Sequence, residues 1–300
     1  MKNEQVDTEN HKKISFTADH HPYFRFLGEF PFAEDIEKAV NGKVAFQREV
    51  GQDMAIIPAF EARCRSTNEV IRKYVEEKGI RQILSIAAGM EQRGIEFASS
   101  YPDLVYVETD ISNVFETKKV LADKIFAEHN LPNRNGLHFE VADVFSLEQL
   151  KKATHYFSKD KQILVVNEGL LAYYSEEENR RISRNIRDLI SSFGGVWVTP
   201  DPSMNKVNRD AFFVYSPTIK ASQAKIAERT GRNYDKMGFE DDSQALDLFE
   251  SESFSVKRYY RKDLGYSLVT LGKVGLNEAN AKEFDNTLKE RFAVWVMSPK

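Results

Sequence analysis

Five short apolar runs alternate with helical stretches along this 300-residue chain, and that alternation constrains the fold most. The runs are rich in β-branched and apolar residues, as strands are, and they cover 81–87, 104–109, 137–141, 162–167 and 195–199. Strands separated by helices need crossover connections, so they pair in parallel and their sheet is covered on both faces. Two further runs, 254–260 and 292–297, predict a terminal strand pair at the sheet edge, with room for an antiparallel insertion. The expected fold is therefore α/β, a doubly wound, mostly parallel sheet of seven strands.

The segments around these strands predict helices. Residues 53–78 carry apolar side chains close to a 3.6-residue period and end at Gly79, a residue that commonly terminates helices. Between strands, 112–130 and 175–193 have the clearest helical patterns. The second starts with Ser175, and a glutamate three positions later completes a capping box. The sheet is thus expected to carry helices with defined ends.

Two aromatic-rich segments stand outside this alternation. Residues 15–50 contain prolines that interrupt any long helix, and residues 201–240 mix aromatic and polar side chains. We expect both to form helical cap elements, the second inserted at one end of the sheet. Residues 1–13 are charged without an apolar period and predict a flexible tail. Because the sequence shows no internal repeat or low-complexity linker, residues 14–300 are expected to form a single domain.

Charge and composition exclude several classes of function. The chain has 42 Lys and Arg against 46 Asp and Glu, a net charge of −4, so it offers no general attraction to nucleic acid. Its apolar runs are far shorter than the roughly 20 residues that span a bilayer, so no membrane association is expected. A single cysteine, Cys64, cannot form an intrachain disulfide or, alone, hold a metal. We therefore expect a cytoplasmic protein without a metal site.

The ends of the first two strands outline a nucleoside site. The first strand runs into Ala87, Ala88 and Gly89, and the second ends at Asp110, 21 positions after the glycine. Roughly 20 positions separate a glycine turn from a carboxylate that binds a ribose. Dinucleotide turns have glycine at three spaced positions, and Ala87 and Gln92 occupy the first and third here. The pattern favours S-adenosylmethionine, which has a ribose but no phosphate; an unliganded tight turn is the alternative.

Two more acidic residues follow strands. Asp143 and Val144 come after the third strand, where a carboxylate can accept from an adenine amino group and an apolar side chain can pack on the ring. Capping of a helix is the ordinary alternative for Asp143. Glu168 follows the fourth strand and precedes Gly169. Because such folds bind ligands at the carboxyl ends of parallel strands, Glu168 is a candidate site residue.

With these segments in place, the chain resembles the leucine carboxyl methyltransferase-like family, which includes protein-phosphatase carboxyl methyltransferases and polyketide-synthesis O-methyltransferases. The resemblance runs from about residue 62 to residue 188, and four segments carry it: Ala-Arg-Cys-Arg at 62–65, Ile-Ala-Ala-Gly-Met-Glu-Gln-Arg at 86–93, Tyr-Val-Glu-Thr-Asp-Ile at 106–111 and Glu-Gly-Leu-Leu-Ala-Tyr at 168–173. It implies a Rossmann-like class I methyltransferase with S-adenosyl-L-methionine as its cofactor.

The resemblance also implies roles for individual residues around that cofactor. They are Arg63 at the methionine carboxylate, Gly89 at the close backbone approach, Asp110 at the ribose hydroxyls, Asp143 and Val144 at the adenine, and Glu168 near the amino group. Arg65 is a rival of Arg63, but side chains two residues apart on a helix point in different directions, so only one should reach the site. The family usually has glycine where Ala87 stands and aspartate where Glu91 stands. A methyl group at Ala87 is expected to crowd the turn and weaken cofactor binding.

The methyl acceptor decides whether the enzyme needs a general base. A carboxylate is already ionised at pH 7, whereas an alcohol needs a positioned base, and the six histidines lie outside the matched segments. We therefore predict an O-methyltransferase that acts on a carboxylate or acidic hydroxyl of a small molecule or protein C-terminus, with Tyr173 as a candidate in the acceptor pocket. A protein that binds the cofactor without transferring its methyl group is one alternative, and a nicotinamide-dependent oxidoreductase is another.

Overall fold

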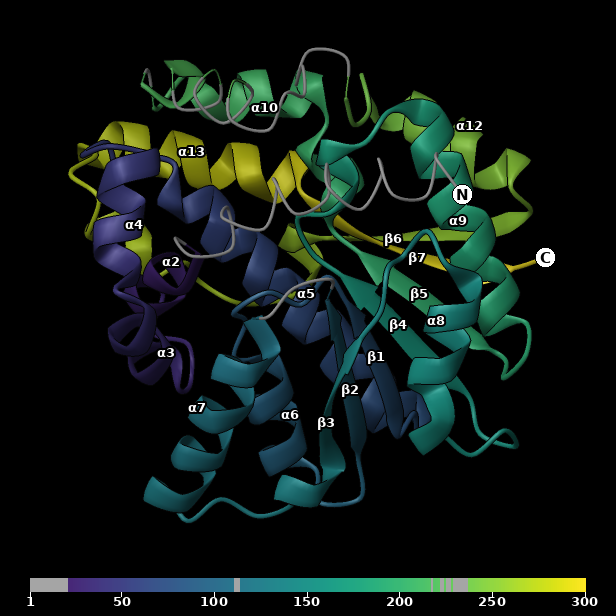
Figure 1. The fold of residues 1–300 in the computed structure, drawn as a ribbon. Coiled ribbons are helices and arrows are strands. Elements are labelled where there is room, and N and C mark those ends of the chain that lie inside the picture. Colours follow the sequence, from purple (N-terminus) through teal and green to yellow (C-terminus); the bar gives the residue numbers. More distant parts are fainter. Residues whose placement is uncertain (1–20, 111–113, 217, 222–223, 225–227, 229–236) are drawn as a thin grey trace.

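The computed structural model describes residues 21–300 except 111–113, 217, 222–223, 225–227 and 229–236 (Figure 1). The predicted tail over residues 1–13 therefore lies outside the described residues. The strands are β1 (Gln82–Ile86), β2 (Val105–Asp110), β3 (Leu137–Val141), β4 (Ile163–Asn167), β5 (Gly195–Thr199), β6 (Phe254–Tyr260) and β7 (Ala293–Pro299). They form one sheet in the order β3-β2-β1-β4-β5-β7-β6. The predicted α/β fold with seven strands is confirmed.

One strand, β7, runs in the direction opposite to the rest of the sheet. Pairing is parallel from β3 through β5, with Ile83 of β1 opposite Leu164 of β4. β7 runs antiparallel to both of its neighbours, β5 and β6, and places Met297 opposite Trp197. The last strand of the chain is therefore the inserted one, and β6 forms the edge of the sheet.

Helices cover both faces of the sheet. One face carries α5 (Ile57–Lys78), α6 (Arg93–Ser100) and α7 (Val114–Glu128), and the other carries α8 (Leu147–Ala153), α9 (Glu176–Ile190) and α12 (Asp242–Ser251). Successive strand residues point to opposite faces, so Ile83 packs with the first set while Leu84 packs with the second. With both faces buried, a strand is apolar throughout rather than alternating with polar residues, which explains the continuous runs in the sequence.

Local chemistry fixes the ends of the two longest predicted helices. α5 has Pro58 in its first turn, where a missing N–H is tolerated, and it ends at Gly79 with φ of 69°. At the start of α9, the Ser175 hydroxyl accepts from the Glu178 N–H and the Glu178 carboxylate accepts from the Ser175 N–H. The predicted capping box is therefore confirmed, and the observed helix ends differ from prediction by only a few residues.

A third hydrophobic cluster joins segments that are far apart in the chain. The helices involved are α2 (His21–Leu27), α4 (Gly42–Glu49), α10 (Lys206–Phe213) and α13 (Glu278–Arg291). In the chain, α3 (Ala33–Val40) follows α2 and precedes α4. Phe24, Phe46, Phe212 and Phe284 are all buried in this cluster. In Figure 1, α2, α3 and α4 lie in purple beside α5, and α10 lies above α13. The described parts of both predicted cap segments thus contribute to one core against the start of α5.

Short 3₁₀ helices turn the chain between these elements. They are η2 (Arg134–Gly136), η3 (Thr154–Tyr156), η4 (Leu171–Tyr173), η5 (Asp201–Met204), η7 (Arg261–Asp263) and η8 (Thr270–Gly272). Within the described part of the chain, no helix is both long and apolar enough to cross a membrane. Two of these turns, η4 and η5, follow β4 and β5 at the edge of the sheet where the predicted site residues gather.

Candidate active site

The predicted site residues lie at the carboxyl edge of four neighbouring strands. Gly89 follows β1, Asp110 ends β2, Asp143 follows β3 and Glu168 follows β4. These strands are adjacent in the sheet, and the strand order reverses between β1 and β4. Open α/β sheets bind ligands at such a reversal, outside the carboxyl ends of the strands. The sheet topology therefore brings together residues that the sequence spreads over 80 positions.

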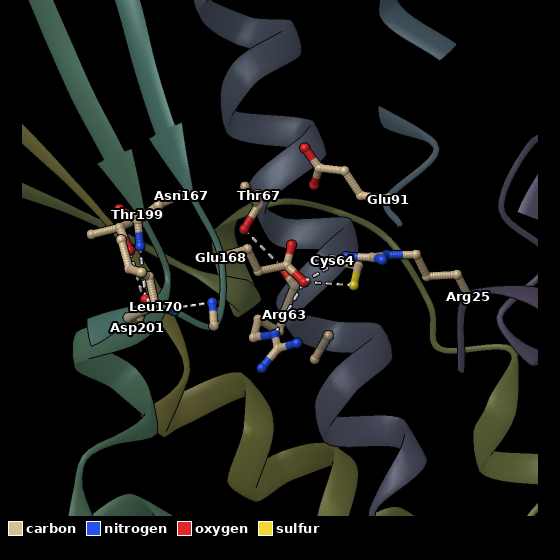
Figure 2. Close-up of polar contacts among 12 residues, drawn as sticks. Arg25, Arg63, Cys64, Thr67, Glu91, Asn167, Glu168, Leu170, Thr199 and Asp201 are labelled. Atoms are coloured by element: carbon tan, nitrogen blue, oxygen red, sulfur yellow. Dashed lines mark hydrogen bonds and ion pairs between the residues drawn. The ribbon is translucent and has the colours of Figure 1, made fainter. Parts of the chain in front are cut away.

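Glu168 is the centre of a buried cluster of charges (Figure 2). Its Oε1 accepts from Arg63 Nε at 3.1 Å, Cys64 Sγ at 3.0 Å and Arg25 Nη2 at 3.3 Å, and its Oε2 accepts from Arg93. Burial raises the pKa of Glu168, but Arg93, Arg63 and Arg25 outweigh it and hold that pKa well below its ordinary value. The side chain is 1% exposed. Three arginines therefore surround Glu168 and favour its ionised form.

Glu91 belongs to the same network through Arg93. Its carboxylate accepts from the Ser85 hydroxyl at 2.6 Å and pairs with Arg93, whose Nε donates to Asn68 at 2.7 Å. All of these side chains are buried. Glu91 therefore links β1 to Arg93, and Arg93 itself contacts Asn68 of α5 and Glu168.

The two rival arginines of α5 point in different directions. Arg65 donates to Glu61 at 2.6 Å and lies over the ring of Phe30, away from Glu168. Of the two rivals, only Arg63 contacts Glu168, as helix geometry predicts. Burial and the nearby Glu168 carboxylate raise the pKa of the Cys64 thiol to about 11, so this thiol stays protonated.

The turn after β1 has an unusual backbone. Ala87 and Gly89 both have positive φ, 53° and 50°. The Gly89 N–H donates to Asp110 Oδ2 at 2.8 Å, and the Gly89 carbonyl accepts from Lys118 Nζ at 2.8 Å. A residue with a Cβ is disfavoured at positive φ by roughly 1–2 kcal/mol, so Ala87 holds a conformation that favours glycine. Ala87 therefore adds backbone strain to this turn, and the weaker cofactor binding expected from its methyl group stays a prediction.

The turn after β4 is held by a carboxylate that sequence reasoning missed. Asp201 of η5 accepts from the N–H groups of Gly169 at 2.7 Å, Leu170 at 2.8 Å and Leu171 at 2.9 Å. It also accepts from Asn167 Nδ2 at 2.7 Å. Burial raises the pKa of Asp201, although these hydrogen bonds favour the ionised form. Its place directly after β5, a strand next to β4, was the signal that could have revealed it.

A buried ion pair on the other side of the site was also missed. Lys118 of α7 pairs with Glu108 of β2, and both side chains are buried. Burial raises the pKa of Glu108 to about 7, although Lys118 opposes that shift. A Cβ on Gly94 would lie 2.2 Å from Glu108 Oε1, so glycine lets α6 pack directly against this carboxylate. A lysine on the inward face of a predicted helix was the available signal.

The remaining predicted residues have structural contacts in this protein. Asp143 Oδ1 accepts from the Phe145 N–H at 2.9 Å, and Val144 is buried beside it. Tyr173 lies half-buried in η4, five residues after Glu168. Their roles toward cofactor and acceptor remain predictions. Two histidines of the described residues have structural contacts. The ring centroid of His21 is 5.7 Å from that of Phe24, and His129 pairs with Asp35.

Comparison with known families identifies the class of this protein. A family model for leucine carboxyl methyltransferases matches residues 25–187, which is more than half of the chain. The chain belongs to the leucine carboxyl methyltransferase family. Membership in this family makes it a methyltransferase that uses S-adenosyl-L-methionine, and it sets aside the nicotinamide-dependent alternative. A comparison with curated protein sequences found no match.

Solved structures share the fold of this leucine carboxyl methyltransferase family member at low sequence identity. A candidate methyltransferase from Thermobifida fusca YX is 14% identical, with 93% of this chain and 94% of that chain covered and a TM-score of 0.55. A DUF574 family protein from Streptomyces avermitilis MA-4680 is 13% identical, with 93% and 96% covered and a TM-score of 0.54. At these identities the likeness shows the fold alone.

The chemistry of the site fits this cofactor. A guanidinium such as Arg63 suits a methionine carboxylate, and an aspartate at the end of β2 suits ribose hydroxyls. Gly89 has no Cβ at the turn where a nucleoside must approach the backbone. These groups come from α5, β2 and the turn after β1, and all of them reach one edge of the sheet.

Proposed function

We propose that this protein transfers a methyl group from S-adenosyl-L-methionine to a carboxylate or acidic hydroxyl of a small molecule or a protein C-terminus. The observation that carries the proposal is the buried cluster of three arginines that contact Glu168. Glu168 has a pKa well below its ordinary value, and the pKa of Cys64 is about 11. Neither group can take a proton from an acceptor near neutral pH. An acceptor oxygen that is already ionised fits such a site best.

The arginines around Glu168 support the same class of acceptor. Arg25 and Arg93 are buried and make charged contacts to this one carboxylate. Buried guanidinium groups favour the ionised form of any nearby acid, so they lower the pKa of a carboxylic acid or acidic hydroxyl that enters the site. We infer that this field keeps the acceptor oxygen unprotonated and therefore nucleophilic.

Positioning then supplies the rest of the rate acceleration. When bound, the cofactor would supply a methyl group on a sulfonium. The acceptor oxygen would bond to that methyl carbon as the carbon–sulfur bond breaks, and S-adenosylhomocysteine would leave. Arg63 would hold the methionine carboxylate of the cofactor and Asp110 its ribose, and Tyr173, in the turn after Glu168, would contact the acceptor. Holding two reactants in line can lower a barrier by several kcal/mol without proton transfer. The single buried thiol, Cys64, suits a reducing cytoplasm as the place of this reaction.

The first experiment is calorimetric titration with S-adenosylmethionine and S-adenosylhomocysteine, with NAD as the control. Micromolar binding of the first two, about −8 kcal/mol, is expected. Transfer of radiolabelled methyl groups to a panel of carboxylates and phenols then tests the acceptor. Methyl esters of carboxylates release methanol in mild base, whereas methyl ethers do not.

The outcomes separate the proposal from its alternative. Base-labile label supports a carboxylate acceptor, and base-stable label on an acidic phenol supports the acidic hydroxyl. Tight binding of S-adenosylhomocysteine with no transfer to any acceptor would favour a protein that binds the cofactor as a sensor or partner. Label on a nitrogen or carbon atom would contradict O-methylation.

A further inference from the structure

Helix α7 directs one lysine into the interior, next to the turn that follows β1. Lys118 Nζ donates to the Gly89 carbonyl at 2.8 Å and pairs with the Glu108 carboxylate of β2. The two side chains are 1% and 0% exposed. An ammonium this deeply buried requires a counter-ion, and Glu108 provides it.

Stability alone is a weak reason for such a pair. Taking both charges out of water costs about as much as their attraction returns, and apolar residues of similar size often stabilise a protein equally well. The informative contact is therefore the one that an apolar side chain could not make. For Lys118 that contact is the hydrogen bond to the Gly89 carbonyl.

The Gly89 residue is held at both of its polar backbone groups. Its N–H donates to Asp110 at the end of β2, and its carbonyl accepts from Lys118 in the next helix. Its φ of 50° places it in the left-handed region, where glycine has many other conformations available. Two charged side chains on opposite sides of the residue thus select one orientation of this backbone.

Glu108 is itself confined. Gly94 brings α6 so close that a Cβ there would lie 2.2 Å from Glu108 Oε1 and 2.8 Å from a methyl group of Leu137. The carboxylate therefore has little room to move, and the paired ammonium of Lys118 is aimed in a fixed direction. Helix α6 and strand β3 pack against Glu108 on one side, and Lys118 reaches the Gly89 carbonyl on the other.

We propose that Lys118 is a positioning residue for S-adenosyl-L-methionine. It fixes the Gly89 turn in the shape that the cofactor meets, and Glu108 holds the ammonium in place. Lys118 acts through Gly89 and does not itself touch the cofactor. The turn would then be formed before the cofactor arrives, which lowers the cost of ordering it on binding.

The test measures S-adenosylhomocysteine binding by calorimetry, without any methyl acceptor, so its outcome does not depend on the acceptor proposed above. Lys118→Met alone leaves Glu108 as a buried, unpaired charge and can prevent folding. The decisive variant is therefore the double substitution K118M/E108Q, which removes both charges together. Lys124→Met is the matched control, because Lys124 lies on the same helix and is 63% exposed.

The expected results follow from the hydrogen bond between Lys118 and the Gly89 carbonyl. K118M/E108Q should bind S-adenosylhomocysteine roughly tenfold to a hundredfold more weakly, as expected for one hydrogen bond to a charged group. E108Q removes the carboxylate that holds the ammonium but keeps the donor to the Gly89 carbonyl, so folded E108Q should lose less affinity than K118M/E108Q. Lys118→Arg, which can still donate to Gly89, should recover part of the loss.

Hydrogen exchange supplies the second readout. In folded K118M/E108Q, amides of residues 87–92 should exchange faster than in the wild type, while those of β5 should be unchanged. Unchanged affinity of the folded double variant would overturn the proposal. So would an equal loss in E108Q or Lys124→Met, or unchanged exchange over residues 87–92.

Discussion

The turns after β1 and β4 follow adjacent strands, and charged side chains hold them in different ways. After β4, one carboxylate, Asp201, accepts from three successive N–H groups and from Asn167. After β1, two side chains hold Gly89: Asp110 accepts from its N–H, and Lys118 donates to its carbonyl. The β4 turn therefore depends on a single group, whereas the β1 turn depends on two.

The two turns also differ in backbone strain. The β4 turn has glycine at its positive φ, with Gly169 at 75°, whereas the β1 turn places Ala87 at 53°. A non-glycine residue keeps such a conformation only where its surroundings determine it. The β1 turn is thus strained and is held by two charged side chains. The β4 turn is unstrained and is held by one.

The largest expected effect comes from Asp201→Ala. This change leaves three N–H groups and the Asn167 amide without their acceptor, and hydrogen bonds to a charged group contribute about 1.5–3 kcal/mol each, not additively. We expect the free energy of unfolding to fall by roughly 3–5 kcal/mol in urea titration. Asp188→Ala, at an exposed pair with Arg187, is the control. A loss no larger than in the control would mean that the β4 turn does not depend on Asp201.

Arg63 and Arg65 test which side of α5 faces the cofactor. Arg63→Ala should weaken S-adenosylhomocysteine binding by about 1.5–3 kcal/mol, the range for hydrogen bonds to charged groups. Arg65→Ala should leave binding unchanged, because Arg65 contacts Glu61 instead of Glu168. Calorimetry on both variants checks this, and the reverse pattern would exchange their assignments.

The ion pair behind the β1 turn should make stability depend on pH. Glu108 has a folded-state pKa of about 7, above its ordinary value of 4.5, because of burial. The stability contributed by the protonated carboxyl is complete below about pH 4.5 and is lost as pH rises through 7. Relative to Glu108→Gln, the wild type should therefore lose on the order of 1–3 kcal/mol between pH 5 and pH 8. Parallel stability curves for the two proteins would show that this carboxyl does not titrate there.

Substitution of Asp110 should weaken cofactor binding more than it lowers the stability of the fold. Asp110→Ala is expected to weaken S-adenosylhomocysteine binding by roughly 1–3 kcal/mol, because a ribose hydroxyl and the Gly89 N–H both lose an acceptor. The protein should stay folded, since Lys118 still holds the Gly89 carbonyl. Asp103→Ala, which is exposed near the start of β2, is the control. Unchanged affinity in calorimetry would remove Asp110 from the site.

The smallest effect is expected from Ala87→Gly. Glycine relieves the left-handed strain, partly offset by its greater freedom in the unfolded chain, so stability should rise by about 0.5–1 kcal/mol. Ala88→Gly, where φ is not positive, should lower stability instead. Urea titrations of both variants measure the difference. A destabilised Ala87→Gly would mean that the methyl group contributes packing that outweighs the strain.

Much of the site could be predicted because strand ends can be read from local patterns. Gly89, Asp110, Asp143 and Glu168 each follow a predictable strand, and parallel pairing brings those ends to one edge. Arg25 and Asp201 could not be found in this way. Arg25 contacts Glu168 across 143 positions, and Asp201 contacts Gly169 across 32 positions. No local periodicity specifies such partners.

The sequence by itself determined the order of strands and helices, the helix caps and the edge of the sheet where ligands bind. These depend on hydrophobic periodicity and on the conformations open to single residues, which neighbours in the chain decide. Only the tertiary structure decided which charges are buried together, such as Lys118 with Glu108 and Arg63 with Glu168. Such pairing depends on distances of a few ångströms between groups far apart in the chain, and those distances exist only once the elements have packed.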